Sequence, residues 1–189
     1  MKKVIITLSI IGIIVCVFFV SFYFFIISGA FSIFMSNPPK PEITYGEFPF
    51  ALEYEIDGVN YKIEDTIVCE FDGFKSLGTA GKYRQWKTFL KSGNEYVTLL
   101  DLTSLNEINE YGHVMQELYF YYGNAEYYMG DENRYMQRDA QSFEEVCYKC
   151  QRNDGGISHS AYSAEKAYEK YKIKLIKWEC ESPIKNTFK

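Results

Sequence analysis

The N-terminal part of the chain lacks charge over a long stretch. No Asp, Glu, Lys or Arg occurs from Val4 to Met35, and every acidic residue of the chain follows this stretch. Crossing the hydrocarbon core of a membrane takes roughly 20 helical residues, because a helix rises about 1.5 Å per residue. Val4 to Ile27 alone is longer than that. We therefore predict that residues 1–35 form a transmembrane anchor.

A cleavable signal peptide is the alternative interpretation of this stretch. Ser28, Gly29 and Ala30 are small enough for a cleavage site. However, the apolar part of a signal peptide runs for about 7 to 15 residues, and here apolar residues continue beyond the small ones. Lys2 and Lys3 precede the stretch, so the positive-inside rule predicts a single-pass protein of the cell membrane with its C-terminal domain outside.

Three prolines separate the anchor from the rest of the chain. Pro38, Pro39 and Pro41 cannot continue a helix, so we predict a proline-rich linker over residues 36–42 and one extracytoplasmic domain over residues 43–189. A domain of this length can bury a single core. Beyond the anchor, 18 Lys and Arg stand against 25 Asp and Glu, an acidic balance that disfavours nucleic acid as a partner.

Alternating apolar residues predict β-strands for much of this domain. From Phe50 to Ile56 every second residue is apolar, Asp57-Gly58 suits a type I′ turn, and the alternation resumes at Val59. Ser163 is a suitable N-cap for an amphipathic helix. We predict an α+β fold: a mainly antiparallel β domain with one amphipathic helix. Further predictions are a second hairpin at 83–90 and 96–102, strands at 117–122 and 172–180, and a short helix at 143–148.

Six strings spread through the domain resemble one group of proteins. They are ITYGEFPF (43–50), IEDTIVCEFDGF (63–74), KYRQW (82–86), LKSGN (90–94), AEYYMGD (125–131) and IKWEC (176–180). Together they resemble uncharacterised single-span membrane-anchored proteins of anaerobic Gram-positive bacteria. The resemblance covers most of residues 43–188 and implies a shared fold and location. It implies no activity and no functional residue.

Four cysteines follow the anchor, an even number in a domain expected outside the cell. Cys69 and Cys180 share strand parity with apolar neighbours, which suggests a structural disulfide between them; two buried thiols are the alternative. Cys147 and Cys150 form a C-x-x-C pair, the spacing of thiol-disulfide oxidoreductases. Because no βαβ pattern surrounds the pair, a local structural disulfide or free thiols remain open as well. We expect no metal and no cofactor.

The chain holds 17 tyrosines, and all but Tyr23 follow the anchor. Such an excess suggests that some reach the surface, where tyrosine gives a large contact area at low entropic cost. We therefore expect a membrane-anchored binding or interaction module for a protein or glycan partner, rather than an enzyme. The alternatives are a thiol oxidoreductase and an accessory subunit of a membrane complex, acting through small residues of the anchor. The candidate binding surface consists of Tyr119, Tyr121, Tyr122, Tyr127 and Tyr128.

Overall fold

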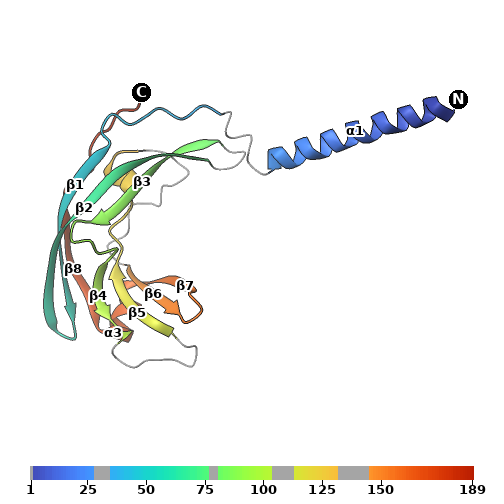
Figure 1. The fold of residues 1–189 in the computed structure, drawn as a ribbon. Helices are drawn as coiled ribbons and strands as arrows, with labels where there is room; N and C mark the ends of the chain where they lie inside the picture. The colour runs from blue at the N-terminus through green and yellow to red at the C-terminus, as the bar shows by residue number, and fades with distance from the viewer. Residues whose placement is uncertain (1, 28–34, 77–80, 104–112, 132–144) are drawn as a thin grey trace. The chain divides into compact units, whose positions relative to one another are not determined.

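A computed structural model describes residues 2–27, 35–76, 81–103, 113–131 and 145–189 (Figure 1). The chain divides into two compact units, one of residues 1–40, 72–85 and 188–189, the other of residues 41–71 and 86–187. The first unit contains helix α1 (Lys2–Ile27). Among the residues described, no helix has both the length and the apolar character that crossing a membrane requires.

The first hairpin forms as predicted. β1 (Tyr45–Ile56) pairs antiparallel with β2 (Val59–Ser76), and Ile56 lies opposite Val59, so the loop has two residues. Both loop residues have positive φ, 50° at Asp57 and 82° at Gly58. A type I′ turn requires this backbone, and its twist matches that of the two strands. The Asp-Gly pair therefore sets the register of the longest hairpin in the domain.

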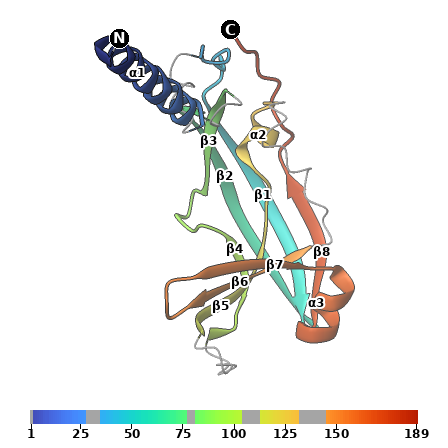
Figure 2. The same cartoon turned by 90° about the vertical axis from the view of Figure 1, so that its right-hand side faces the viewer.

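Among the described residues, the strands form two four-stranded antiparallel sheets, in agreement with the predicted mainly antiparallel fold. The first has the order β3-β2-β1-β8, with β3 (Lys82–Leu90) and β8 (Ile173–Cys180) at its edges. The second has the order β4-β5-β6-β7. Figure 2 shows β6 and β7 running across the long strands β1 and β2. The strands of the second sheet are β4 (Val97–Asp101), β5 (His113–Phe120), β6 (Val146–Arg152) and β7 (Ile157–Tyr162).

The core lies between the two sheets and draws side chains from both. On β1, every second residue from Phe48 to Tyr54 is buried. On β5, Leu118 has no exposed surface, and burying a side chain of this size contributes about 2 kcal/mol. The rings of Phe120 on β5 and Trp178 on β8 lie 4.7 Å apart and so join the two sheets.

The predicted second hairpin is wrong, although both of its strands exist. β3 pairs with β2 in the first sheet, while β4 belongs to the second sheet. The chain passes from one sheet to the other across residues 91–96. Gly93 has a φ of 87°, and its N–H donates to the carbonyl of Leu90 at 2.8 Å. The chain therefore does turn near Gly93, after β3. The turn redirects the chain instead of returning it alongside β3.

The predicted helix at 143–148 is wrong for residues 146–148, because β6 begins at Val146 and pairs along both sides. Residues 143 and 144 lie outside the described residues. The amphipathic helix is confirmed as α3 (Ala164–Tyr171), whose first turn is capped by Ser163 accepting from the N–H of Lys166. The sequence did not predict β7 or the short helix α2 (Ala125–Tyr128). The predicted strand at 117–122 corresponds to the end of β5, and the one at 172–180 to β8.

The C-terminal residues pair with part of the predicted linker. In the first unit, Lys40 and Lys189 exchange two backbone hydrogen bonds of 2.8 and 3.0 Å. In the second unit, the N–H of Glu42 donates to the carbonyl of Thr187 at 2.9 Å, and Pro41 is buried. Lys40 and Glu42 are therefore paired through their backbones, although the prolines predicted a linker over residues 36–42.

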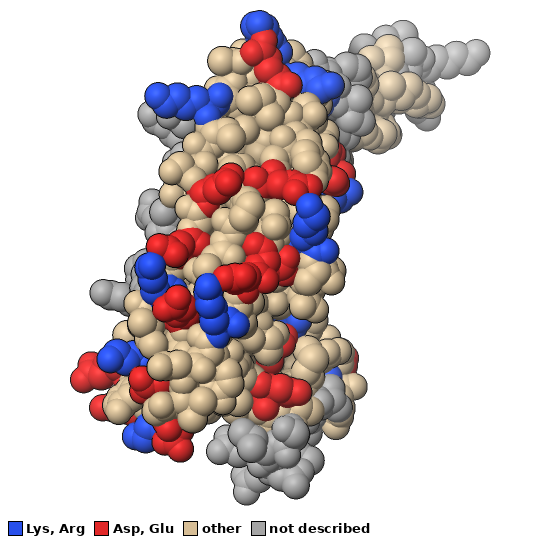
Figure 3. Space-filling model, turned by 90° about the vertical axis from the view of Figure 1, so that its left-hand side faces the viewer, with Lys and Arg blue, Asp and Glu red and all other residues tan. Residues whose placement is uncertain are grey.

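The outer face of the first sheet carries charged side chains. Glu53 on β1 lies opposite Lys62 on β2 and opposite Lys177 on β8. Figure 3 shows acidic side chains across this face, with Lys and Arg among them. Cross-strand pairs of opposite charge are typical of a sheet face in contact with water.

Candidate functional site on the second sheet

Strand β6 places one lysine on the outer face of the second sheet. Residues alternate between the two faces of a strand, and Val146 and Cys150 point into the core. Lys149 therefore points outward, opposite Glu117 on β5 and His159 on β7. Its side chain is nevertheless only 10% exposed. A lysine buried to this extent requires partners for its charge.

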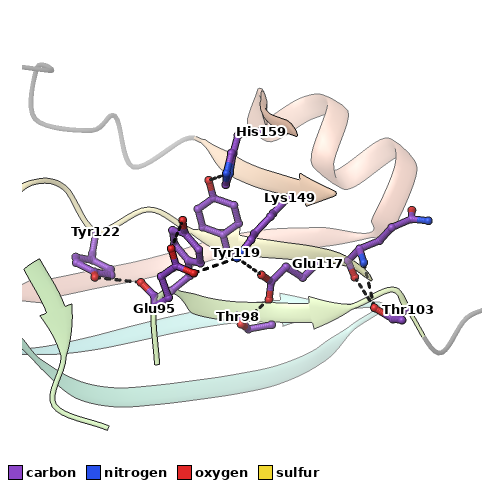
Figure 4. A network of polar contacts seen from close by, with 10 residues as sticks. Glu95, Thr98, Thr103, Glu117, Tyr119, Tyr122, Lys149 and His159 are labelled. Carbon is purple, nitrogen blue, oxygen red and sulfur yellow. Dashed lines mark hydrogen bonds and ion pairs between the residues drawn. The ribbon is translucent and has the colours of Figure 1, made fainter. Parts of the chain in front are cut away.

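Two carboxylates and an aromatic ring surround this ammonium group (Figure 4). Lys149 Nζ lies 3.1 Å from Glu95 Oε2 and 3.5 Å from Glu117 Oε1. It also lies 4.6 Å from the centre of the Tyr96 ring, a cation–π distance. The hydroxyl of Thr98 on β4 donates to Glu117 Oε2 at 3.2 Å. The cluster thus ties together all three strands from β4 to β6.

Three aromatic rings extend the cluster towards the edge of the sheet. The rings of Tyr96 and Tyr119 lie 4.4 Å apart, and His159 is about equally distant from both, at 6.1 and 6.0 Å. The Tyr119 hydroxyl forms a 3.0 Å hydrogen bond with His159 Nδ1. We call this cluster the Lys149 patch; it consists of Glu95, Tyr96, Glu117, Tyr119, Lys149 and His159.

The patch is electrostatically organised. Hydrogen bonds from the Tyr96 hydroxyl, at 2.9 Å, and from Lys149 hold the pKa of the Glu95 carboxyl below its usual value. Burial, and then the neighbouring Glu95 carboxylate, raise the pKa of Tyr96 to about 12. Burial likewise raises the pKa of Tyr119 well above the ordinary tyrosine value. At neutral pH both tyrosines are therefore neutral, and Glu95 is ionised.

This arrangement suits binding better than catalysis. The ammonium of Lys149 is engaged by two carboxylates, and Nδ1 of His159 is engaged by Tyr119. The Glu95 side chain, in contrast, is 70% exposed, and His159 is exposed too. The patch therefore offers a fixed carboxylate, an imidazole and aromatic surface. Within the described ranges, no three His, Cys, Asp or Glu side chains are grouped so that they could hold a metal ion.

The five tyrosines of the predicted binding surface do not share one face. Tyr119 and Tyr121 have outward strand parity, and Tyr119 is covered by the patch at 5% exposure. Tyr122 and Tyr128 belong to the core, where the Tyr128 hydroxyl donates to the carbonyl of Tyr122. Tyr127 is exposed. Tyrosines of this segment thus lie on both faces of the sheet, because successive strand residues point to opposite faces.

The C-x-x-C pair lies on a strand, which removes the geometry of a redox pair. Cys147 and Cys150 are three positions apart on β6, so they point to opposite faces and their Cα atoms are about 10 Å apart. A disulfide needs Cα atoms within about 7 Å. Neither cysteine is in a disulfide; Cys150 is buried in the core and Cys147 is half-buried.

The disulfide expected between Cys69 and Cys180 is not present either. Both side chains lie on the core side of the first sheet, as predicted, but both are free thiols. β1 lies between their strands: Cys69 is opposite Gly46 and Cys180 is opposite Phe50. Two strand spacings are about 9.6 Å, beyond disulfide range before the offset along β1 is added. Burial raises the pKa of the Cys69 thiol to about 12.

No protein-family model, curated protein or solved structure matches this chain. The site is therefore defined by its own residues. Of the residues in the Lys149 patch, only Tyr119 was identified from the sequence; Glu95, Tyr96, Glu117, Lys149 and His159 were missed. A signal was present: in VCYKCQR the apolar residues at 146, 148 and 150 alternate with the lysine position, a strand pattern that the C-x-x-C motif concealed.

Proposed function

We propose that this protein is a membrane-anchored binding module whose domain lies outside the cell membrane. The anchor would be residues 4–27, which contain no charged side chain, preceded by Lys2 and Lys3. This anchor is proposed from the sequence of residues 4–27 alone, and the structural finding on membrane-crossing helices does not support it. At about 1.5 Å per residue, a helix of that length exceeds a hydrocarbon core of roughly 30 Å.

The observation that supports binding is the Lys149 patch. Its aromatic rings and its charges face away from the core, and the main ionic contacts within it fix the side chains in place. A surface whose side chains are already ordered loses little entropy when a partner binds. Tyr96 and His159 provide ring surface, and Glu95 provides an exposed negative charge. A protein partner can contact both the ring surface and the negative charge.

Fractionation tests the location. The full chain, expressed with its N-terminal segment, should remain with the membrane after alkaline carbonate washing, and protease added to intact spheroplasts should degrade the domain. A matched chain with Ile13→Glu and Val17→Glu should leave the membrane fraction. Recovery of the unaltered chain in the soluble fraction would contradict the anchor.

Site-specific photo-crosslinking tests the binding surface. Ile157, which is 55% exposed and lies two residues from His159 on the same face, is replaced by a photoreactive amino acid. The matched control is the same replacement at Ile176, which is 45% exposed on β8 of the other sheet. A product of one discrete mass at position 157 and none at 176 is expected. Equal crosslinking at both positions, or none at 157, would remove the patch as the binding surface.

A further inference from the structure

Strand β7 has one paired edge and one open edge. It pairs with β6 from Ile157, which lies opposite Gln151, to Tyr162, which lies opposite Val146. It is the last strand in the order of the second sheet. In the part of the chain that the structure describes, no strand lies on its other side. Alternate backbone N–H and C=O groups of β7 therefore point away from the sheet. Such an edge is a template for an added strand.

The other edge strands carry protection that β7 lacks. Proteins block strand addition with charged side chains, proline or very short edge strands. β3 carries Lys82, Arg84 and Lys87, β8 carries Lys174, Lys177 and Glu179, and β4 has only five residues. The sequence of β7 is ISHSAY, with no Lys, Arg, Asp, Glu or Pro. Five of its six residues are exposed, and Tyr162 is half-buried.

We propose that the open edge of β7 binds an extended segment of a partner protein, with Lys or Arg at alternate positions, as a fifth strand of this sheet. This inference rests on the proposed binding function and names its partner chemistry. Backbone hydrogen bonds to β7 supply affinity, and side chains of the added strand that lie on the outer face contact the Lys149 patch.

The charges of the patch select basic side chains. Ile157, His159 and Ala161 face outward with the patch, since His159 pairs with Lys149 and Ala161 with Cys147. The exposed Glu95 carboxylate is fixed above β6 by Lys149. An added strand lies about 9.6 Å from β6, and a Lys or Arg side chain of that strand can extend across β7 towards the exposed Glu95 carboxylate. Glu95 is then its partner.

The same charges disfavour a second copy of this chain as the added strand. Each copy carries 25 acidic residues against 18 basic ones after the N-terminal segment, so two copies repel each other. Two β7 strands side by side would also bring no Lys or Arg to Glu95, because ISHSAY contains neither. A basic segment satisfies both the backbone groups and the carboxylate.

Hydrogen exchange of the full chain in non-ionic detergent tests the inference. The probe is a nine-residue peptide in which lysine alternates with threonine. At a saturating concentration it should slow amide exchange within residues 157–162 by about tenfold or more, and it should leave β8 unchanged. The same peptide N-methylated at every residue keeps its charge but donates no backbone hydrogen bond, so it should give no protection.

Two further arms separate edge pairing from charge attraction. A peptide with glutamate in place of lysine should bind at least about fivefold more weakly, and the difference should shrink in the Glu95→Gln variant. Replacing both Ile157 and Ala161 by Lys, at exposed positions, should abolish protection by the lysine peptide.

Several results would overturn the inference. They are no protection of β7, equal protection by the N-methylated peptide, or protection that depends only on protein concentration, which would indicate pairing of two copies. If residue 157 still crosslinks a discrete partner in cells while β7 gains no protection, the strand-addition inference fails and the proposed binding function stands.

Discussion

The side chain of Asn186 binds both main-chain groups of Ile43. Its Oδ1 accepts from the Ile43 N–H at 3.0 Å, and its Nδ2 donates to the Ile43 carbonyl at 2.8 Å. Ile43 precedes the first strand of the domain, and Asn186 is three residues from the C-terminus of this chain. One side chain therefore takes the place of a strand partner at this position.

Replacing this side chain should destabilise the domain. Asn186→Ala removes both hydrogen bonds, and each such bond contributes about 0.5 to 1.5 kcal/mol to stability. We expect a loss of about 1 to 2 kcal/mol in urea unfolding of the full chain. Asn186→Asp keeps the acceptor and should lose about half as much. Lys185→Ala, at an exposed neighbour, is the control; a loss equal to that of Asn186→Ala would contradict a specific role for the amide.

Removing the charge of Lys149 should leave Glu117 without its cation. Lys149→Met keeps the aliphatic packing, while the Glu117 side chain is only 16% exposed. We expect the free energy of unfolding at pH 7 to fall by about 1 to 3 kcal/mol, which is the typical cost of leaving a buried polar group without a partner. Adding Glu117→Gln should restore most of the loss. Lys177→Met, in an exposed ion pair, should change stability little, and an equal effect there would argue against a special role for Lys149.

The stability of the domain should depend on pH through Glu126. Burial, and then the nearby Asp131, raise the pKa of the Glu126 carboxyl. The folded state therefore holds its proton to higher pH than the unfolded state, so this residue lowers stability as pH rises above the unfolded value of about 4.3. We expect Glu126→Gln to have a higher Tm than the unaltered chain at pH 8 and the same Tm at pH 4.

A matched substitution controls for the loss of one negative charge. Glu165→Gln, at an exposed position in the first turn of α3, should not raise the Tm at pH 8, because a carboxylate at a helix N-terminus is stabilising when ionised. If Glu126→Gln lowers the Tm at pH 8, the carboxylate is stabilised where it lies, and the direction of the pKa shift is wrong.

The cysteines should remain reduced and differ in reactivity. With a pKa near 12 and no exposed surface, Cys69 should resist alkylation by iodoacetamide at pH 8 until urea unfolds the chain. Mild oxidation should not join Cys147 to Cys150, because they point to opposite faces of β6. Mass spectrometry of non-reduced peptides measures both outcomes. A Cys147–Cys150 disulfide in the folded protein would contradict the strand assignment.

The features predicted correctly from the sequence are local ones. Asp57-Gly58 between two alternating strands defines a hairpin without help from the rest of the chain. Ser163 before a helical apolar face does the same for α3. In each case, neighbours in the sequence are also partners in space, and so the pattern is enough.

The features missed depend on which distant strands pair. The turn near Gly93 indicates that β3 ends, but not that the next strand joins another sheet. The C-x-x-C spacing suggests a helix or a redox loop until β5 and β7 are known to flank it. The Lys149 patch draws Glu95, Glu117 and His159 from three separate segments, and no spacing within one segment reveals such a set. The structure at these positions depends on which distant strands pair, and the local sequence does not reveal that pairing.

The pairing of residues 40–43 with residues 186–189 also bears on the order of synthesis. These partners are separated by almost the whole domain, and β8, the neighbour of β1, follows all the other strands that the structure describes. During translation, β1 and β2 can form their hairpin early, but one edge of β1 stays open until β8 has been synthesised. Folding of this domain is therefore completed late, and contacts of such long range close slowly.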